Sequence, residues 1–443
     1  MIRTYQVNID DKPAWQSLLK RAPQVNSNDL NQQVETIINE VKRNKDQALF
    51  DYTARFDHCE LDSLYVTEAE IKEAYELVSN KDIELIKNII ARVKNYHEIN
   101  KPKNTIVDSK DGVCCHKVFS AIESVGLYVP GGSAPLISTL IMLAMPAKVA
   151  GCKQVNVCTP VNAQGKIHPL LLVAADLCGV DIIYKIGGAQ AIAAMAYGTE
   201  SVTKVNKIYG PGNSWVTKAK MLVADDIDGA AIDMPAGPSE VLVIAERQAN
   251  AQFVAADLLA QAEHGADSQA ILITTSNALA NEVSATINQQ ISTLTRQEII
   301  KEALVHSRIL VVKTLEDAFV FANDYAPEHL ILQVQDPEKY IDQIHNVGAV
   351  FMGQWAAEAL GDYVTGSNHV LPTYGYAKSF SGLSTIDFMK AMSVQYVDEK
   401  GLLAIGDLAM KLADIEGLTA HKLAVDLRLK ALEDTTEATC LRS

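Results

Sequence analysis

The chain has 443 residues, which is too long for one ordinary hydrophobic core, so we expect two or three domains. Hydrophobic residues make up 48% of the chain and charged residues 21%, proportions that are typical of globular proteins. The formal net charge is −15, and no stretch is rich in Lys and Arg. This charge argues against binding to nucleic acid or to an anionic membrane.

The start of the chain and its cysteines predict a cytoplasmic protein. Residues 1–5 contain no apolar run and no cleavage signature, so we expect no secretory signal. The most apolar stretch, residues 134–150, is interrupted by prolines and a lysine and is too short to span a bilayer. Seven cysteines without C-x-x-C spacing are typical of reduced thiols.

The first hundred residues have a helical pattern. Asn28 or Asp29 can cap a helix that runs to Phe56, because apolar residues recur at helical spacing along it. Thr67 and Glu70 form a capping-box pattern, which predicts helices that extend to about residue 100. Two strands are then expected, over residues 113–120 and 123–129.

Further along, short apolar strands alternate with helices, which predicts two α/β lobes with parallel sheets and a boundary near residues 230–239. The expected strands are 154–158, 181–186, 204–208, 241–245, 270–274, 307–312, 330–334 and 349–352. The expected helices of the second lobe are 249–264, 276–292 and 314–324. From about residue 385 the chain is strand-like and then helical over 400–432, with too little apolar surface for a core of its own.

Gln261 and His264 are three residues apart, so on a helix they share one face. Gly265 predicts a left-handed helix end that leaves His264 in the last turn. A side-chain carbonyl and an imidazole on one face form half of a metal site. The same spacing is also typical of a polar stripe on an exposed helix.

Glu328 and His329 are adjacent at a predicted loop–strand junction after a proline. Two neighbouring titratable groups held at such a junction suit general acid–base catalysis. The alternative interpretation is a pair of solvated residues at the start of a strand.

Three further stretches carry clustered functional residues. Residues 361–373 form a polar, glycine-rich loop with Asp362 as a possible anionic ligand and His369 as a possible substrate contact. Residues 234–240 form a turn that presents the hydroxyl of Ser239, and residues 416–421 place His421 in a first helical turn. Taken together, Gln261, His264, Asp362 and His421 offer two nitrogens and two oxygens, a set that suits Zn²⁺ better than Ca²⁺ or Mg²⁺.

Glycine-rich turns follow three of the predicted strands, at residues 126–132, 186–190 and 209–213. Such turns let a ligand approach backbone amides and helix N-termini, which suits phosphate groups. The G-x-G-x-x-G fingerprint of dinucleotide-binding folds is absent from the sequence. These turns therefore indicate a nucleotide or a phosphorylated small molecule.

The combination of motifs resembles the histidinol dehydrogenase family. The motifs that carry the resemblance are GLYVPGG (126–132), YGPGN (209–213), DMPAGPSE (233–240), LLAQAEHG (258–265), YAPEHL (325–330), GDYVTGSNHVLPT (361–373) and EGLTAH (416–421). The resemblance implies oxidation of L-histidinol to L-histidine through L-histidinaldehyde, the last steps of histidine biosynthesis, with two NAD⁺ reduced in succession.

The resemblance also implies the site residues. The ligands of one Zn²⁺ per subunit would be Gln261, His264, Asp362 and His421. Further substrate contacts would be Ser239, His329, His369 and Glu416, and NAD would lie against Tyr128, Gln190 and Asn213.

The family fold implies two incomplete Rossmann-like lobes, a helical N-terminal segment and a C-terminal tail that is exchanged in a homodimer with shared active sites. The expected domains are residues 1–23, residues 24–127 together with 239–384 as the main lobe, residues 128–238 as the NAD-binding lobe, and residues 385–443 as the dimerisation tail. Glu416 and His421 are expected to complete the neighbouring subunit's site.

The expected mechanism uses His329 as the base in both oxidations and Glu328 as the base that activates water. Zinc is expected to hold the imidazole and amino groups of the substrate. Three alternatives stay open at this point. They are attack on the aldehyde by a cysteine (Cys114, Cys115 or Cys152), a zinc hydrolase with Glu328 as the base, and a binding protein without catalysis.

Overall fold

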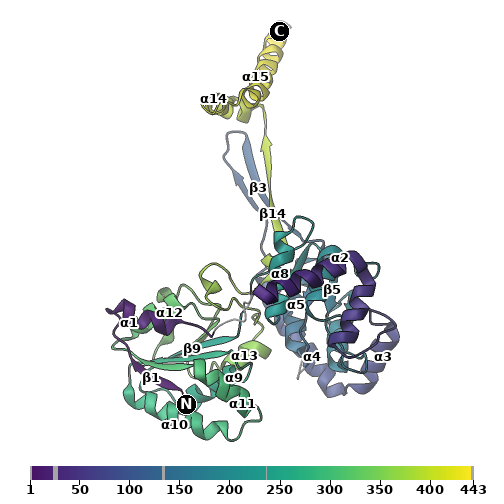
Figure 1. Ribbon diagram of the computed structural model, residues 1–443. Coiled ribbons are helices and arrows are strands. Elements are labelled where there is room, and N and C mark those ends of the chain that lie inside the picture. Colours follow the sequence, from purple (N-terminus) through teal and green to yellow (C-terminus); the bar gives the residue numbers. More distant parts are fainter. Residues whose placement is uncertain (1, 23–27, 132–134, 236, 441–443) are drawn as a thin grey trace. The chain divides into compact units, whose positions relative to one another are not determined.

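In the computed structural model of the protein, the described residues are 2–22, 28–131, 135–235 and 237–440. The chain divides into two units, and Figure 1 shows the elements of both. The first unit contains Met1–Asn100 and Ile122–Phe388, and the second contains Lys101–Ala121 and Met389–Ser443.

One parallel sheet of the first unit has six strands in the order β1-β11-β10-β9-β12-β13. Its strands are β1 (Arg3–Gln6), β9 (Glu240–Ala245), β10 (Gln269–Thr274), β11 (Arg308–Val311), β12 (His329–Gln333) and β13 (Ala349–Met352). Strands β9, β10 and β12 are buried along their whole length, as parallel strands covered on both faces must be.

Alternate residues of these strands point into two separate cores. Val241 and Val243 pack with the helices α9 (Ala251–Ala262), α10 (Asn277–Ile291) and α11 (Gln297–His306). Leu242 and Ile244 pack with α12 (Leu315–Tyr325) and with Trp15 of α1 (Lys12–Gln16). The predicted alternation of strands and helices in the second lobe is thus confirmed, but α11 was not predicted. Strand β1 was not predicted either, and it lies in the N-terminal segment expected to be helical.

The other parallel sheet of the first unit has five strands in the order β6-β5-β4-β7-β8. Its strands are β4 (Ser124–Tyr128), β5 (Gln154–Cys158), β6 (Ile182–Tyr184), β7 (Lys207–Tyr209) and β8 (Ala231–Ile232), and its helices are α5 (Ile137–Ala150), α6 (Pro169–Leu177), α7 (Gly188–Tyr197) and α8 (Ser214–Asp225). Along the chain, β5 and β6 are added on one side of β4, and β7 then pairs with the opposite side of β4. In open α/β sheets, ligands bind where the strand order reverses in this way, outside the carboxyl ends of the strands.

The N-terminal helices belong with this five-stranded sheet. They are α2 (Asn28–Phe56, interrupted at Lys45), α3 (Glu68–Leu77) and α4 (Asn80–Ile99). The apolar stripe of α2, including Val34 and Val41, is part of one core with Ile192 of α7 and Val216 of α8. The sequence-based division instead grouped residues 24–127 with the later lobe. The capping box of Thr67 and Glu70 is present at the start of α3, as predicted.

The connections of the first unit after β12 are short helices that shape the site. They are α13 (Glu358–Tyr363) and the 3₁₀ turns η2 (Pro337–Gln343), η3 (Tyr376–Lys378) and η4 (Thr385–Phe388), and a further 3₁₀ turn, η1 (Ser17–Leu19), follows α1. Glu358 and Gly361 of α13 are buried, so this short helix is held by packing and not by its intrinsic propensity.

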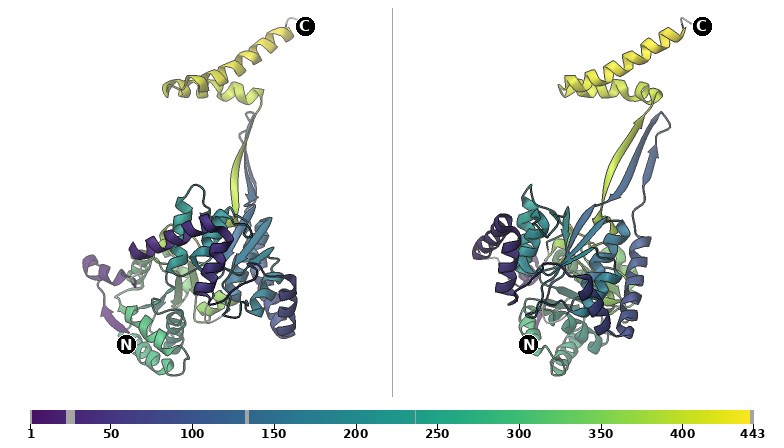
Figure 2. Two further views of the ribbon diagram at one scale, coloured as in Figure 1. Left: turned by 45° about the vertical axis from the view of Figure 1, so that its right-hand side comes forward. Right: turned by 90° about the vertical axis from the view of Figure 1, so that its right-hand side faces the viewer.

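The second unit is an antiparallel sheet followed by a helical hairpin. Its strands, β2 (Thr105–Asp108), β3 (Val113–Ala121) and β14 (Met389–Val397), pair in the order β14-β3-β2. The helices α14 (Glu399–Ile415) and α15 (Thr419–Cys440) pack against each other (Figure 2). Gly406 of α14 lies next to the side chain of Leu429 of α15. The expectation of a strand followed by helices in the tail is confirmed. Among the described residues, no helix is both long and apolar enough to cross a membrane.

Candidate functional site

A cavity of about 620 Å³ in the first unit collects most of the predicted site residues. Eight of them line it, namely Asn213, Ser239, Gln261, His264, Glu328, His329, Asp362 and His369. Asn213 and its neighbours come from the carboxyl ends of the five-stranded sheet. Glu328 and His329 come from the amino end of β12 in the six-stranded sheet. The cavity therefore faces the strand-order reversal of one sheet and the starting edge of the other.

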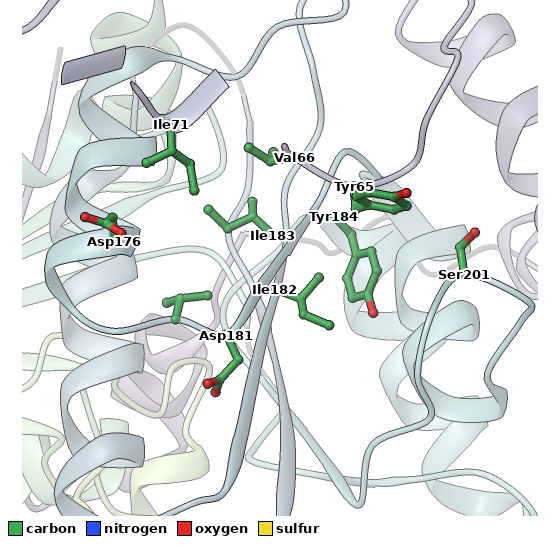
Figure 3. A pocket seen from close by; sticks show the side chains of 10 residues that line it. Tyr65, Val66, Ile71, Asp176, Asp181, Ile182, Ile183, Tyr184 and Ser201 are labelled. Atoms are coloured by element: carbon green, nitrogen blue, oxygen red, sulfur yellow. The ribbon is translucent and has the colours of Figure 1, made fainter. Parts of the chain in front are cut away.

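A second cavity, of about 360 Å³, lies beside β6 and is lined largely by apolar and tyrosine side chains (Figure 3). Its two acidic residues already have partners in the fold. Asp176 accepts a hydrogen bond from the hydroxyl of Tyr75 at 2.6 Å, and Asp181 accepts one from the backbone of Val155 at 2.8 Å. A cavity whose polar groups are satisfied in this way is a weaker candidate for a catalytic site.

The Glu328–His329 pair is held by the backbone of Glu240, the first residue of β9. The Glu240 amide donates to Glu328 Oε2 at 2.8 Å, and the Glu240 carbonyl lies 3.0 Å from His329 Nδ1. This follows from the parallel pairing of β12 with β9, in which His329 lies opposite Val241. Both side chains of the pair are buried, so the interpretation of two solvated residues is wrong.

His329 is arranged as a proton acceptor. Since a carbonyl accepts hydrogen bonds, Nδ1 must carry the proton, and Nε2 is left with its lone pair. Within the described part of the chain, Nε2 has no hydrogen-bond partner, and it lies 3.7 Å from Asp362 Oδ1. Burial lowers the pKa of His329 to about 3, so the imidazole is neutral at physiological pH.

Three acidic side chains lie close together at the site: Glu328 and Asp362, which line the cavity, and the buried Glu358. Burial raises the pKa of Glu328 well above its usual range, and the carboxylates of Glu240 and Asp362 add to this. Burial also raises the pKa of Glu358, with further contributions from Asp362 and Glu328, and it raises the pKa of Asp362 to about 6. Several buried carboxylates in one place are costly unless a cation compensates them.

The geometry of these groups fits a divalent cation. His264, Glu358 and Asp362 each offer one ligand atom, and these atoms lie within 4.8 Å of one another. Glu358 Oε2 is buried without a hydrogen-bond partner among the described residues. The imidazole of His264 is accessible from the cavity. The surrounding protein displaces part of its water and so lowers its pKa. A lowered pKa keeps the imidazole neutral, and a neutral imidazole can bind a metal through a ring nitrogen. A mixed nitrogen and oxygen donor set of this kind is one that Zn²⁺ accepts.

Gln261 can complete this donor set. Its hydrogen-bond surroundings assign the amide nitrogen to the side that faces Glu358 Oε1 at 2.8 Å and the Glu240 carbonyl at 3.3 Å. With the nitrogen held there, the amide oxygen is turned to the opposite side. Gln261 itself is fully buried in the last turn of α9.

The helix end differs from the prediction. Helix α9 ends at Ala262, with Glu263 as its C-cap, so His264 lies just beyond the helix and not in its last turn. Gly265 does not adopt the left-handed conformation that was expected to stop the helix. The amide of His264 still bonds to the Gln261 carbonyl at 3.2 Å, which keeps the two side chains near each other.

The predicted NAD contacts lie at the carboxyl edge of the five-stranded sheet. Asn213 caps α8 and accepts hydrogen bonds from the amides of Trp215 and Val216. Tyr128 and Gln190 are buried and do not line the cavity, and the hydroxyl of Tyr128 accepts a hydrogen bond from the Gly188 amide at 3.0 Å.

The turn between β7 and α8 is fixed by a buried ion pair of Lys220 and Asp233. The Gly210 amide donates to Asp233 Oδ2 at 2.8 Å, and the Gly210 carbonyl accepts from Lys220 Nζ at 2.8 Å. Gly210 has a φ of +117°, and a Cβ atom at this position would meet the Tyr128 carbonyl oxygen at 2.1 Å. The close approach of the two backbones therefore requires glycine.

Glu416 and His421 belong to the second unit. Glu416 is the C-cap of α14, and His421 lies in the first turn of α15, as the sequence predicted. Their participation in the site stays a prediction.

The cysteines do not favour the covalent alternative. Cys152 is buried, and burial raises its pKa to about 11. Burial and the nearby Asp108 raise the pKa of Cys114. A thiol with a raised pKa contains little of the reactive thiolate at neutral pH.

Glu358 and Glu240 are central to the site, although neither was predicted from the sequence. Glu358 and Asp362 are four residues apart on α13, a spacing that places both carboxylates on one helix face. That spacing is visible in the sequence and could have identified Glu358. Glu240 carries no such signal, because its backbone, and not its side chain, contacts the Glu328–His329 pair.

Comparisons with known proteins identify the family of the chain. The sequence model of the family described as histidinol dehydrogenase matches residues 20–429. A histidinol dehydrogenase of Legionella pneumophila (strain Paris) is 52% identical over 406 residues, which cover 91% of this chain and 94% of that protein. One of Yersinia pestis is 47% identical over 424 residues, which cover 96% and 95% of the two chains.

A solved structure is similar over nearly the whole chain. The crystal structure of histidinol dehydrogenase from Elizabethkingia anophelis superposes with a TM-score of 0.94 at 45% sequence identity, and the match covers 98% of this chain and 99% of that one. The matched region contains the cavity and every element that lines it. The chain therefore belongs to the histidinol dehydrogenase family, a family of oxidoreductases.

Proposed function

We propose that this protein oxidises L-histidinol to L-histidine through L-histidinaldehyde, with Zn²⁺ as its metal and two NAD⁺ as the hydride acceptors. The observation that carries the proposal is one cavity lined by His329, whose Nε2 is neutral and unpartnered among the described residues, and by His264 and Asp362, which form a compact cluster with the buried Glu358. A base and a cation-binding cluster side by side suit removal of a proton from a bound alcohol.

The cation would be held by Gln261, His264 and Asp362, together with His421 of a neighbouring subunit. Zn²⁺ supplies, when it is bound, a positive charge that orients the imidazole and amino nitrogens of the substrate and compensates the buried carboxylates. Ser239, His369 and Glu416 would contact the rest of the substrate. The ring of His369 is fixed for this by its hydrogen bond from Nδ1 to the Asp362 carbonyl at 2.8 Å.

In the first oxidation, His329 Nε2 takes the hydroxyl proton of the alcohol while the carbinol carbon loses a hydride to the nicotinamide. The Glu240 carbonyl stabilises the resulting imidazolium through Nδ1–H, as an oriented acceptor does in other histidine bases. Because the ring is buried, it is uncharged before the step and does not have to lose a proton first.

Between the two oxidations, Glu328 takes a proton from water as the water oxygen adds to the aldehyde carbon, and the His329 imidazolium returns its proton to the carbonyl oxygen. These transfers complete a gem-diol and leave His329 neutral. The raised pKa of Glu328 makes its ionised carboxylate a stronger base than an exposed glutamate. Oε2 is held by the Glu240 amide, which leaves the other oxygen to contact the water. His329 then removes a diol proton as the second hydride leaves.

NAD would bind at the strand-order reversal of the five-stranded sheet, against Tyr128, Gln190 and Asn213. The amino end of α7 begins at Gly188, and that of α8 follows Asn213, so the positive ends of two helix dipoles are available to the pyrophosphate. The fixed turn at Gly210 keeps the backbone open to a ligand of this kind.

The second unit supports a homodimer with shared sites. Along α14, Leu408, Leu412 and Ile415 are more than half exposed and recur at helical spacing. An apolar face of this kind on a unit with little core of its own needs a partner. A second copy of the chain would cover it, and exchange of the tails would bring Glu416 and His421 to the neighbouring site.

The test is a coupled assay of NADH formation and zinc content. Purified protein given L-histidinol and NAD⁺ is expected to form two NADH per histidine, and removal of zinc by a chelator is expected to abolish this until zinc is restored. Zinc-loaded protein that forms histidine without NADH, or that shows no turnover at all, would contradict the proposal. Hydrolysis of an amide or ester without NADH formation would favour the zinc hydrolase instead.

A further inference from the structure

Arg21 lies at the end of the N-terminal segment and reaches the six-stranded sheet from behind the Glu328–His329 pair. Its guanidinium donates to both carboxylate oxygens of Glu240, through Nε to Oε1 and through Nη2 to Oε2 at 3.1 Å. The same Nη2 donates to the carbonyl of Tyr325 at 2.6 Å and to that of Ala326 at 3.2 Å. The guanidinium also stacks on the Tyr325 ring, with 4.0 Å between its carbon and the ring centroid.

Arg21 thus contacts the two parts of the chain that support the Glu328–His329 pair, namely Glu240 and the turn at 325–326. Glu240 holds Glu328 through its amide and His329 through its carbonyl. Tyr325 and Ala326 form the turn that enters β12, where Ala326 has a φ of 55° in the left-handed region. One side chain therefore ties the start of β9 to the turn that carries both proposed bases.

We propose that Arg21 is a positioning residue that sets the geometry of the Glu328–His329 pair by joining Glu240 to the turn at 325–326. The proposal rests on the proposed function, since it assigns Arg21 to the same reaction. Arg21 does not line the cavity, and it acts through the residues that do.

The electrostatics explain why an arginine is needed. Glu240 is 2% exposed, and besides Arg21 its carboxylate accepts one further hydrogen bond, from the Tyr374 amide at 3.1 Å. A buried carboxylate without a cation is unstable, so loss of the guanidinium would drive Glu240 to protonate or to move. Either change shifts the backbone groups that hold the pair. A lysine offers one charge but not the planar fork that reaches a carboxylate and two carbonyls together.

Arg308 offers a matched control. It is another partly buried arginine that holds the same N-terminal segment, through the carbonyls of Leu18 at 2.6 Å and Lys20 at 2.7 Å. Its hydrogen bonds in the described chain reach neither Glu240 nor the turn at 325–326, although its charge acts on the Tyr325 hydroxyl. Arg308→Met therefore removes a comparable anchor of the segment and leaves the hydrogen bonds that support the pair in place.

The experiment compares Arg21→Met, Arg21→Lys and Arg308→Met as zinc-loaded proteins. Arg21→Met is expected to lower kcat for both oxidations by up to about a hundredfold, because misplacement of catalytic groups by about 1 Å has effects of this size. The KM for NAD⁺ should stay within about twofold of wild type, since none of the predicted NAD contacts is bonded to Arg21 or Glu240, and kcat is compared at full zinc occupancy. Arg21→Lys should recover part of kcat, and Arg308→Met should keep nearly all of it.

A second readout separates positioning from a general effect on folding. In Arg21→Ala, millimolar guanidinium should restore activity in a saturable manner, whereas Arg308→Ala should not respond. Equal losses of kcat in the Arg21 and Arg308 variants, with no rescue, would overturn the proposal. If wild-type protein with zinc does not oxidise histidinol at all, the proposed function fails, and that result is distinct from an active wild type with unaffected Arg21 variants.

Discussion

At the scale of single residues, the site depends on two neighbours that share one support and have different chemistry. Glu328 and His329 both bond to the peptide groups of Glu240, yet burial moves their pKa values in opposite directions. Desolvation favours the neutral form of each group, so the imidazole is uncharged with a lone pair available, and the glutamic acid retains its proton more strongly. Two groups with such different pKa values suit a reaction in which one base takes a proton from an alcohol and another takes a proton from water.

The substitution Glu328→Gln should separate the two half-reactions. Aldehyde formation from histidinol should continue, while formation of histidine should fall by roughly 10²–10⁴, the range typical of a lost general base. Quantification of aldehyde and histidine after single turnovers checks this. Equal damage to both oxidations would remove Glu328 from the activation of water.

Glu358→Gln offers a contrast at the same scale. Its carboxylate belongs to the cluster with His264 and Asp362 and holds the Gln261 amide. We expect this variant to lose zinc affinity and to slow both oxidations together, whereas Glu328→Gln should keep its zinc. Metal analysis of the two variants side by side gives the comparison, and full zinc content in Glu358→Gln would contradict this role.

At the scale of elements, the turn after β7 is the clearest case of backbone chemistry. Gly210→Ala should destabilise the protein, because its φ of +117° costs about 1–2 kcal/mol for a residue with a Cβ atom, and the Cβ would also meet the Tyr128 carbonyl. It should also raise the KM for NAD⁺ through the displaced turn. Urea unfolding and NAD⁺ titration measure the two effects. Gly353→Ala is the control, because Gly353 also has a positive φ (+89°) but open space around it.

Helix α4 is tied to the later loops by His97, which is fully buried. Thr385 donates to the His97 carbonyl at 2.9 Å, and Asn368 Nδ2 lies 3.4 Å from His97 Nε2. Burial lowers the pKa of His97 from 6.5 to about 4. At a pH between these two values, His97 is protonated in the unfolded chain and neutral in the folded chain. The free energy of unfolding therefore decreases as the pH falls.

The loss of stability from His97 should be about 2 kcal/mol between pH 7 and pH 5. Urea unfolding at about pH 7 and pH 5 measures it, and His97→Gln should remove this part of the pH dependence. His345→Gln, at an exposed position, should leave it unchanged. An unaltered pH dependence in His97→Gln would show that other groups are responsible.

At the scale of the whole molecule, the proposed shared site makes a prediction about mixed dimers. Glu328→Gln and His421→Asn should each be nearly inactive as pure proteins. After subunit exchange at equal concentrations, about half of the dimers are hybrids, and each hybrid has one site in which both residues are native. Activity should therefore recover to about a quarter of wild type. No recovery after verified exchange would mean that each subunit uses its own His421.

Much of the fold follows from local patterns. The strands β5, β9, β10, β12 and β13 lie within about a residue of the predicted ranges, because buried parallel strands are continuous apolar runs bounded by turns. Strand β1 was missed because four residues of mixed polarity at a sheet edge carry no such run. The grouping of α2 could not be predicted either, since an apolar stripe records that a helix face is buried and not which surface covers it.

The sequence by itself determined the nature of the groups at the site. Glu328 and His329, the Gln261–His264 pair and the polar loop around Asp362 carry their chemistry in the residue types and their spacing. Only the tertiary structure decided that they meet at the amino edge of one sheet, opposite the carboxyl edge of the other, and that Glu240, Glu358 and Arg21 organise them. The physical reason is that Glu240 holds the pair through its backbone groups, and this contact depends on the pairing of β9 with β12 and leaves no mark in the local sequence.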